Sequence, residues 1–325
     1  MSMSLQLSIR TMFADLVQQV DTAPLAGSVY TRQRDGIEYI YAKLPAGRAR
    51  VDRFIGKSGD PAAEAQAASL RRGGELARSR REIISILKGH RLASPDRALG
   101  AALDAIAFAG LFKQGAVLVG TGAYMMFEPL VGSRLPAPTL MTGDLDLATA
   151  QLALTADPPE RMEDILRRAD ATYEGIPQLD PRQPPSRFRN AEGYLVDLLT
   201  PTRSRKDQNP MPLKALEAGA APLHYLDWLI SEPIPTVALW GSGIALQVPQ
   251  PAKFAVHKLI LAQRRDPANR HKRAKDLDQA RALIDALLVH DRFVIEDMLA
   301  DARGRGRAGW AEPIARSLEE IGTPI

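Results

Sequence analysis

The spacing of apolar and polar positions changes twice in the first third of the chain. Close to the N-terminus, apolar residues recur at helical spacing and predict an amphipathic helix that ends before Pro24: Phe13, Leu16, Val17 and Val20. Residues 28–56 then alternate with a period of two, which predicts three short strands joined by turns. The helical period returns from residue 61 to about residue 92. We therefore expect residues 1–94 to form an accessory region that contains a helix, a small β-meander and an arginine-rich helix.

Helices and strands alternate through the next segment, residues 95–205. Beyond this segment fewer strands than helices are expected. The expected elements are a buried helix at 98–111, a buried strand at 116–119, a helix at 123–131, a strand at 144–147, a helix at 158–169, a proline-rich loop at 177–186 and a strand at 193–199. Such alternation is typical of an α/β or α+β core. Residues 225–230 and 235–248 are expected to add strands near the core, and the pattern is helical from Pro251 onward. Residues 206–325 are therefore predicted to form a mainly helical C-terminal domain.

Composition narrows the class of protein. Of the 325 residues, 45% are hydrophobic and 25% are charged, as in an ordinary globular protein. The lack of cysteine excludes disulfides, thiolate zinc sites and cysteine nucleophiles, and the five histidines do not show the paired spacing of a zinc site. The N-terminus lacks the pattern of a secretory signal, and no stretch approaches the roughly 18 apolar residues of a membrane span. We therefore expect a soluble, cytoplasmic protein with no membrane partner.

Positive charge is concentrated in a few segments. The chain has 42 Lys and Arg against 38 Asp and Glu, a net charge of +4. Residues 71–91 hold seven Lys or Arg against two Glu, and residues 264–275 are also strongly basic. Residues 264–275 could bind the phosphates of a triphosphate or of an RNA acceptor, and residues 71–91 could form a nucleic-acid face; either segment could instead be ordinary solvated surface. The meander at 28–56 mixes arginines with Tyr and Phe, so it could be a wing that grips nucleic acid or a lid that packs its rings on the core.

A glycine turn follows the first buried strand of the middle segment. The run Leu118-Val119-Gly120-Thr121-Gly122 predicts the end of a strand and the start of a helix, a junction where backbone N–H groups can face an anion. The hydroxyl of Thr121 adds a further donor. Because no Gly-Lys-Ser/Thr follows, a Walker-type ATPase is not indicated. The alternative is a plain strand-to-helix turn that needs glycine for a positive φ.

Three carboxylates lie on predicted strands. Asp144 and Asp146 are two residues apart, so they project to the same side of a strand while Leu145 and Leu147 face the core. Like charges this close repel unless a cation lies between them, and hard oxygen ligands suit Mg²⁺. The alternative for this pair is a turn residue followed by a helix-capping or surface residue. Asp197 interrupts an apolar strand, and we expect it to face a cleft, a cation or an arginine because burying it unpaired would be costly.

These motifs carry a resemblance to a known family. The Gly-Thr turn before a helix, the Thr-x-Asp-x-Asp strand and the later strand with a single Asp resemble the DNA polymerase β-type nucleotidyltransferase superfamily. The stretches GTGAYMMFEPLVGSRLPAPTLMTGDLDLA, YLVDLLTP and PAKFAVHKLIL are similar to a bacterial branch of nucleotidyltransferase-fold proteins and, more distantly, to the nucleotidyltransferase toxins of abortive-infection systems. The similarity spans roughly residues 98–287. It implies an α+β fold, with a polymerase β-like core of short mixed sheet and helices, a helical C-terminal domain and an N-terminal accessory region outside the core.

The resemblance also implies roles for individual residues. Gly120 and Thr121 match the motif that holds the nucleotide phosphates, and Asp144 and Asp146 match the pair that ligates the divalent metals, Mg²⁺ or Mn²⁺. Asp197 matches the third carboxylate, which completes the metal site and helps to deprotonate the attacking hydroxyl. Lys258 falls where related enzymes place a basic residue near the triphosphate; alternatively, Lys258 and His257 form the solvated face of an amphipathic helix. The chain departs from the usual pattern in having Thr instead of Ser after the glycine and a longer gap before the paired carboxylates.

The implied reaction is transfer of a nucleoside monophosphate from an NTP to an acceptor hydroxyl, with release of pyrophosphate by a two-metal mechanism. The acceptor could be RNA, a protein side chain or a small molecule. The alternative function is a catalytically silent nucleotidyltransferase fold that acts as a nucleic-acid or protein-binding module.

Overall fold

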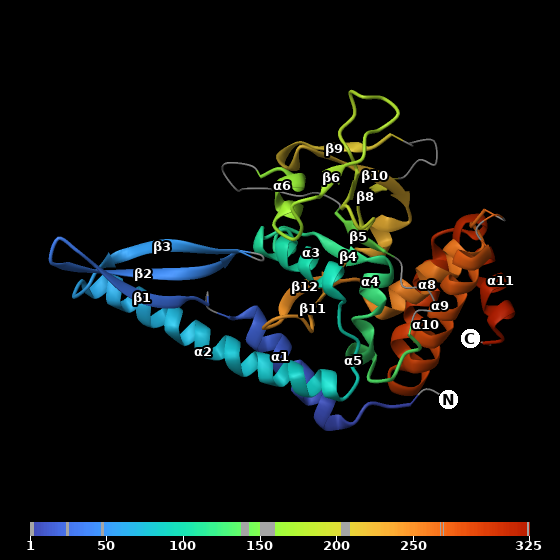
Figure 1. Cartoon of the computed structure of the whole chain (residues 1–325). Helices are drawn as coiled ribbons and strands as arrows, with labels where there is room; N and C mark the ends of the chain where they lie inside the picture. Colours follow the sequence, from blue (N-terminus) through green and yellow to red (C-terminus); the bar gives the residue numbers. More distant parts are fainter. Residues whose placement is uncertain are drawn as a thin grey trace.

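The molecule has three parts, an N-terminal arm, a central mixed sheet with helices, and a group of C-terminal helices (Figure 1). The computed structural model describes residues 3–23, 26–46, 49–137, 143–149, 160–202, 209–266, 268, 270–323 and 325. Figure 1 shows the arm extending away from the central sheet and the C-terminal helices on the opposite side of the molecule. The structure is therefore α+β, as the sequence predicts.

The arm consists of two helices and a three-stranded antiparallel sheet. Its elements are α1 (Leu7–Asp21), β1 (Ser28–Arg34), β2 (Ile37–Ala46), β3 (Ala49–Lys57) and α2 (Pro61–Gly89). Asp35 and Gly36 join β1 to β2, and both have positive φ, at 52° and 75°, as a tight two-residue hairpin requires. The side chain of Asp60 accepts a hydrogen bond from the backbone N–H of Ala62 and so caps α2. The predicted order of helix, meander and long helix is confirmed.

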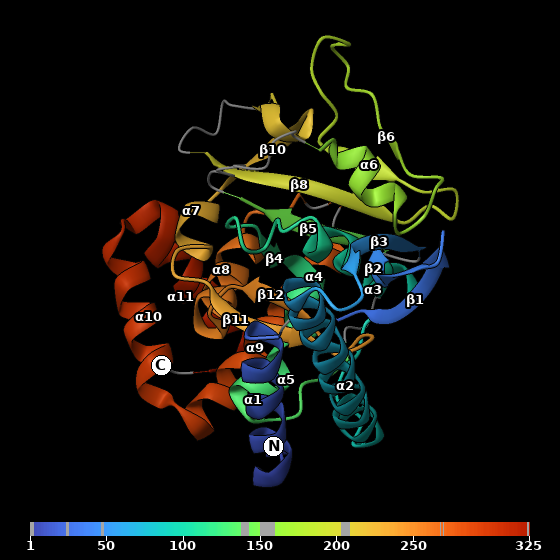
Figure 2. The same cartoon turned by 90° about the vertical axis from the view of Figure 1, so that its left-hand side faces the viewer.

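The inner face of the arm sheet packs on the first turns of α2, and the rest of α2 reaches back to the core. Ile40 forms a small buried cluster with Ala63 and Ala67. A Cβ on Gly56 would lie 2.6 Å from the Cβ of Ala63, so the glycine allows sheet and helix to approach closely. Further along α2, Ile84 and Leu87 join a second buried cluster, which also contains residues of α1 and Val237 of a hairpin that precedes the C-terminal helices. The base of the arm is thus anchored, while its sheet stands away from the central sheet (Figure 1); Figure 2 looks along the arm toward the core.

The central part is a mixed sheet with short helices. Its elements are α3 (Arg97–Phe108), β4 (Val117–Val119), α4 (Gly120–Tyr124), α5 (Phe127–Val131), β5 (Asp144–Ala148), α6 (Met162–Arg167), β6 (Glu174–Gly175), β7 (Arg187–Arg189), β8 (Leu195–Thr202), β9 (Met211–Leu213) and β10 (Ala218–His224). The strand order is β4-β5-β8-β10-β9, with β5 and β10 parallel to β8. The first half of β8 also pairs with β7, which runs antiparallel to it. β8 is therefore the strand around which the sheet is organised.

Some predicted elements differ from the observed ones. The helix expected at 123–131 is two short helices, and the one expected at 158–169 is described only from residue 160 and forms α6. Residues 225–230 form a short helix, α7 (Leu226–Leu229), instead of a strand. Tyr225 begins this helix with a φ of 69°, and three of the four helical residues are buried. The sequence analysis missed β10, whose run AGAAPLH lacks the β-branched residues that mark a strand and forms one by pairing with β8.

The C-terminal part is helical, as predicted. A hairpin of β11 (Ile234–Ala238) and β12 (Ile244–Val248) precedes α8 (Pro251–Ala262), α9 (Arg270–His290), α10 (Arg292–Gly304), the π-helical turn at Arg307–Ala311 and α11 (Glu312–Ile321). Ten of the twelve residues of α8 are buried, because α8 contacts α5 and α7 as well as α9, α10 and α11. One continuous core joins α3, the central sheet and these helices, so α8 is held against the sheet. No helix of the described residues is long and apolar enough to cross a membrane.

The division into domains at residues 94 and 205 stays a prediction. The chain beyond residue 205 supplies β9 and β10 to the central sheet in addition to the C-terminal helices.

Candidate active site

Three carboxylates meet where β5 and β8 run side by side. Asp146 on β5 is directly opposite Asp197 on β8 in the parallel register, and Asp144 lies two residues earlier on the same side of β5. All three are half-buried, whereas Leu145 alternates with them and is completely buried. The strand predicted from the Asp-Leu-Asp-Leu pattern is confirmed, and the structure brings Asp197 to it.

The glycine turn approaches this cluster from the other edge of β5. β4 pairs antiparallel with β5, and Val119 lies opposite Asp146. Gly120 comes next, with a φ of 64°, and a Cβ there would lie only 2.0 Å from Oδ2 of Asp146. Any other residue would collide with the carboxylate, so glycine is required by its conformation and by the contact. Thr121 follows as the second residue of α4.

Asp146 is short of positive charge. Its burial raises the pKa of its carboxyl group, and the nearby charges of Asp144 and Asp197 raise it further, to about 6. Lys258 and Arg187 oppose this shift but do not cancel it. A half-buried carboxylate in this situation is stabilised by protonation or by a bound cation.

Asp197 is held by an arginine that the sequence analysis did not identify. Nε and Nη2 of Arg187 donate to the two carboxylate oxygens of Asp197, both at 2.6 Å. The carboxylate is 13% exposed and the guanidinium side chain is 52% exposed, so the pair lies at the opening of the site. Of the three partners expected for Asp197, the structure shows an arginine. The Arg-Phe-Arg alternation of β7, with Phe188 buried between two exposed arginines, is a sequence signal that could have placed Arg187 on an outward face.

The chemistry of the donors fits a divalent metal at Asp144 and Asp146. Both are hard oxygen ligands, and the raised pKa of Asp146 shows that a nearby cation would be favourable. Within the described residues, no group of three or more Asp, Glu or His side chains is arranged to hold a metal. Asp197 could join the other two through the acceptor sites that remain on its oxygens, each of which already accepts one hydrogen bond from Arg187.

Lys258 is placed differently from the solvated helix face considered above. It is only 7% exposed, and its Nζ donates to Oδ1 of Asp276 at 2.7 Å. Burial alone would raise the pKa of Asp276, but Lys258 and Arg265 outweigh it and hold this pKa below its usual range. The charge of Lys258 still acts on Asp146, so Lys258 belongs to a structural ion pair and also influences the carboxylates. Neighbouring His257 is also buried, and burial lowers its pKa to about 3, so it is neutral.

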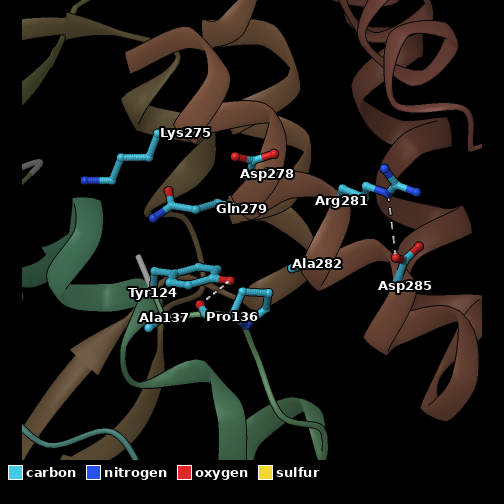
Figure 3. Close-up of a pocket in the computed structure, with 9 residues that line it drawn as sticks. All are labelled: Tyr124, Pro136, Ala137, Lys275, Asp278, Gln279, Arg281, Ala282 and Asp285. Carbon is cyan, nitrogen blue, oxygen red and sulfur yellow. Dashed lines mark hydrogen bonds and ion pairs between the residues drawn. The ribbon is translucent and has the colours of Figure 1, made fainter. Parts of the chain in front are cut away.

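A pocket of about 450 Å³ opens beside this region, between α4, the segment after α5 and α9 (Figure 3). Lys275 lies at one end; burial lowers its pKa, while Asp144 and Asp146 act in the opposite direction, so its ammonium is within electrostatic reach of the carboxylates. Between Lys275 and Tyr124 lies Gln279, which is 3% exposed (Figure 3). Neither polar atom of its carboxamide has a hydrogen-bond partner among the described residues.

Some of the cations in the two basic segments form ion pairs or hydrogen bonds with other parts of the protein. In the segment at 264–275, Arg265 binds Asp276, Arg273 binds Glu320, and Arg264 donates to the carbonyl of Gly309 at 3.0 Å. Arg270 and Lys272 are exposed. In α2, most of the arginines are exposed, but Arg80 is buried and donates to the carbonyl of Ser242 at 3.0 Å. Both segments therefore combine structural and solvent-facing cations.

Comparison with known proteins identifies the family. A search of curated proteins and a search of solved structures gave no significant match. A family model described as Nucleotidyltransferase matches residues 97–304, well over half of the chain. The match runs from α3 to the end of α10 and includes the glycine turn, the three aspartates and Lys258; the finer branch stays a prediction. The chain therefore belongs to a nucleotidyltransferase family, as the resemblance of its motifs implied.

Proposed function

We propose that the protein transfers a nucleoside monophosphate from an NTP to an acceptor hydroxyl at the cluster of Asp144, Asp146 and Asp197. The observation that carries this proposal is the register of β5 and β8, which sets Asp146 beside Asp197 and leaves Asp146 short of positive charge. Gly120 adds a backbone turn in contact with the same carboxylate. A cluster of partly buried like charges is costly for stability, so its presence supports a functional site.

In the proposed reaction, the acceptor oxygen forms a bond to the α-phosphorus of the NTP while the bond between the α-phosphorus and the bridging oxygen breaks. Pyrophosphate leaves with the electron pair of that bond, and the proton of the acceptor hydroxyl passes to Asp197. Asp144 and Asp146 would hold Mg²⁺ or Mn²⁺, which supplies positive charge to the triphosphate and to the acceptor oxygen in the two-metal scheme. Release of Asp197 by Arg187 would free the carboxylate to accept the proton and the guanidinium to face the phosphates.

The remaining groups of the site position the nucleotide. Gly120 and Thr121 would donate to the phosphates, and Lys258 and Lys275 would supply positive charge from α8 and α9. The pocket beside Lys275 is large enough for the nucleoside portion. The carboxamide of Gln279 offers one donor and one acceptor there, which a nucleobase edge can match.

A second candidate function is a silent nucleotidyltransferase fold that binds a partner without chemistry. The Arg187–Asp197 pair favours it, because both oxygens of the proposed base are engaged. The two functions differ in their need for a metal, since binding of a partner on another surface does not require Asp144 and Asp146.

The experiment that tests the proposal uses NTPs labelled at the α-phosphate, Mg²⁺ and either total RNA or a protein lysate. We expect label to appear in one acceptor fraction with the wild-type protein and to be lost with Asp146→Asn. Asp297→Asn, which changes an exposed aspartate on α10, serves as the matched control and should retain activity. Transfer that is undiminished in Asp146→Asn would contradict the mechanism. Metal-dependent NTP binding without transfer to any fraction would favour the silent fold.

A further inference from the structure

The outer face of the arm sheet carries a continuous array of aromatic rings. Tyr30 and Tyr41 are cross-strand neighbours and stack with ring centroids 5.8 Å apart and planes 19° apart. Phe54 on β3 lies opposite Tyr41 and meets it edge to face at 5.5 Å. Tyr39 extends the array, at 6.0 Å from Phe54. Four rings from three strands therefore form one surface, on which Phe54 is 56% exposed.

This face is turned away from the rest of the arm. Residues that alternate with the rings, such as Ile40 and Ala42, are buried on the opposite side, where Ile40 contacts α2. The sheet itself projects from the core (Figure 1). Among the described residues, the ring contacts of these four side chains are with one another and with two cations of the same face. The rings do not close over the core as a lid would.

Positive charge is interleaved with the rings. The guanidinium of Arg32 lies 5.2 Å from the ring of Tyr30 and 5.6 Å from that of Tyr41, and Nζ of Lys43 lies 5.6 Å from the ring of Tyr30. The register places Arg34 and Lys57 on the same face. Among the described side chains of this face there are these four cations and one carboxylate, Asp52. Asp52 lies 3.8 Å from Arg32.

From this arrangement we infer that the outer face of the arm sheet, with Tyr30, Tyr39, Tyr41 and Phe54 as stacking surfaces and Arg32 and Lys43 as phosphate contacts, binds single-stranded nucleic acid. A single strand alternates flat bases with phosphates, and aromatic rings beside cations match both parts. A duplex hides the faces of its bases, so it would meet only the charges. A second copy of the chain, docked through the same face, would bring the cations of the two faces together and would be disfavoured. The binding goes beyond the proposed transfer reaction and does not depend on the carboxylates of the core.

The test measures fluorescence anisotropy of short labelled single-stranded RNA and DNA with the full chain at several salt concentrations. Phe54→Leu removes the most exposed ring and keeps an apolar side chain, and we expect it to weaken binding by about tenfold. Arg32→Gln should reduce the slope of log affinity against log salt by about 0.7, the value for one phosphate contact on a single strand. A duplex of the same sequence should bind more weakly than either strand.

Matched controls use exposed residues of the C-terminal helices. Phe293 is a ring on α10 that is 77% exposed, and Arg316 is an exposed arginine on α11. Phe293→Leu and Arg316→Gln should leave the affinity and its salt slope unchanged. Circular dichroism of each variant verifies that the arm sheet is retained.

Three outcomes would overturn the inference. The first is equal affinity of wild type, Phe54→Leu and Arg32→Gln, and the second is no measurable binding at low salt. The third is a dimer of the wild type that Phe54→Leu dissociates, which would make this face an interface between copies of the chain. Asp146→Asn separates this inference from the proposed reaction, because it should abolish transfer and leave strand binding intact.

Discussion

Asp146 is half-buried and Asp276 is fully buried, and their electrostatic surroundings are opposite. The side chain of Asp276 is 2% exposed and is bound by Lys258 at 2.7 Å and by Arg265 at 2.8 Å. These two cations overcome the effect of burial and lower its pKa. Asp146 has two other carboxylates as neighbours, and its pKa rises to about 6.

The difference separates a structural group from a functional one. A buried carboxylate with two direct ion pairs is satisfied by the protein itself, and removing it leaves the partners unpaired. A half-buried carboxylate beside like charges lowers stability until a group outside the chain, such as a cation, compensates its charge. Lys258 links the two cases, because it binds Asp276 directly and acts on Asp146 only through its charge.

The largest effect is expected at Asp276. Asp276→Ala leaves Lys258 buried without its ion-pair partner, and we expect the free energy of unfolding to fall by about 3–5 kcal/mol. Urea denaturation followed by circular dichroism measures this change. Asp278→Ala, an exposed position on the same helix, is the control and should change stability by less than about 0.5 kcal/mol. Equal effects of the two substitutions would contradict a structural role for Asp276.

The opposite sign is expected at Asp146 in metal-free protein. Because its pKa is raised in the folded state, the folded protein holds a proton that the unfolded chain releases, and this contribution to stability is lost as pH rises from about 4 through 6. Asp146→Asn should therefore raise the free energy of unfolding at pH 7.5 by up to about 3 kcal/mol, with a smaller gain near pH 4.5. Thermal unfolding in EDTA at the two pH values tests this. A variant less stable than the wild type at pH 7.5 would show that Asp146 has a compensating partner.

A smaller effect with the same sign is expected at Gln279. Gln279→Met replaces a buried carboxamide that has no hydrogen-bond partner among the described residues by an apolar side chain of similar shape, and should stabilise the protein by about 1 kcal/mol. If the pocket receives the nucleoside, the same variant should weaken NTP binding about tenfold, as measured by calorimetry with Mg²⁺. Loss of stability together with unchanged NTP affinity would assign Gln279 to the core.

The smallest effect is expected at Arg187. Its guanidinium is half exposed, so the pair with Asp197 contributes at most about 1 kcal/mol to stability. Arg187→Gln should free Asp197 and tighten binding of Mn²⁺ by up to about fivefold, which electron paramagnetic resonance can follow. Arg189→Gln, on the same strand and also exposed, serves as the control. Weaker Mn²⁺ binding in Arg187→Gln alone would mean that Arg187 orients Asp197 for the metal.

The candidate site was predicted in part. Local spacing was sufficient to place Asp144 and Asp146 on one side of a strand and Asp197 on a second strand. It was also sufficient to place the glycine turn between a strand and a helix. The expected triphosphate contacts of Gly120, Thr121 and Lys258 stay predictions. Arg187 was missed because it follows a proline-rich loop on a strand of three residues, too short to show a period.

The amino-acid sequence by itself determined the order of most elements, because periods of two and 3.6 residues and the turn signals of glycine and proline act over a few neighbouring positions. It also determined the family, through motifs that are local in the chain. Only the tertiary structure decided that Asp146 lies opposite Asp197, that Gly120 touches Asp146 and that Lys258 is buried against Asp276. These contacts join residues that are 18 or more positions apart. They depend on strand register and on the packing of α8 against α9, which no local pattern records.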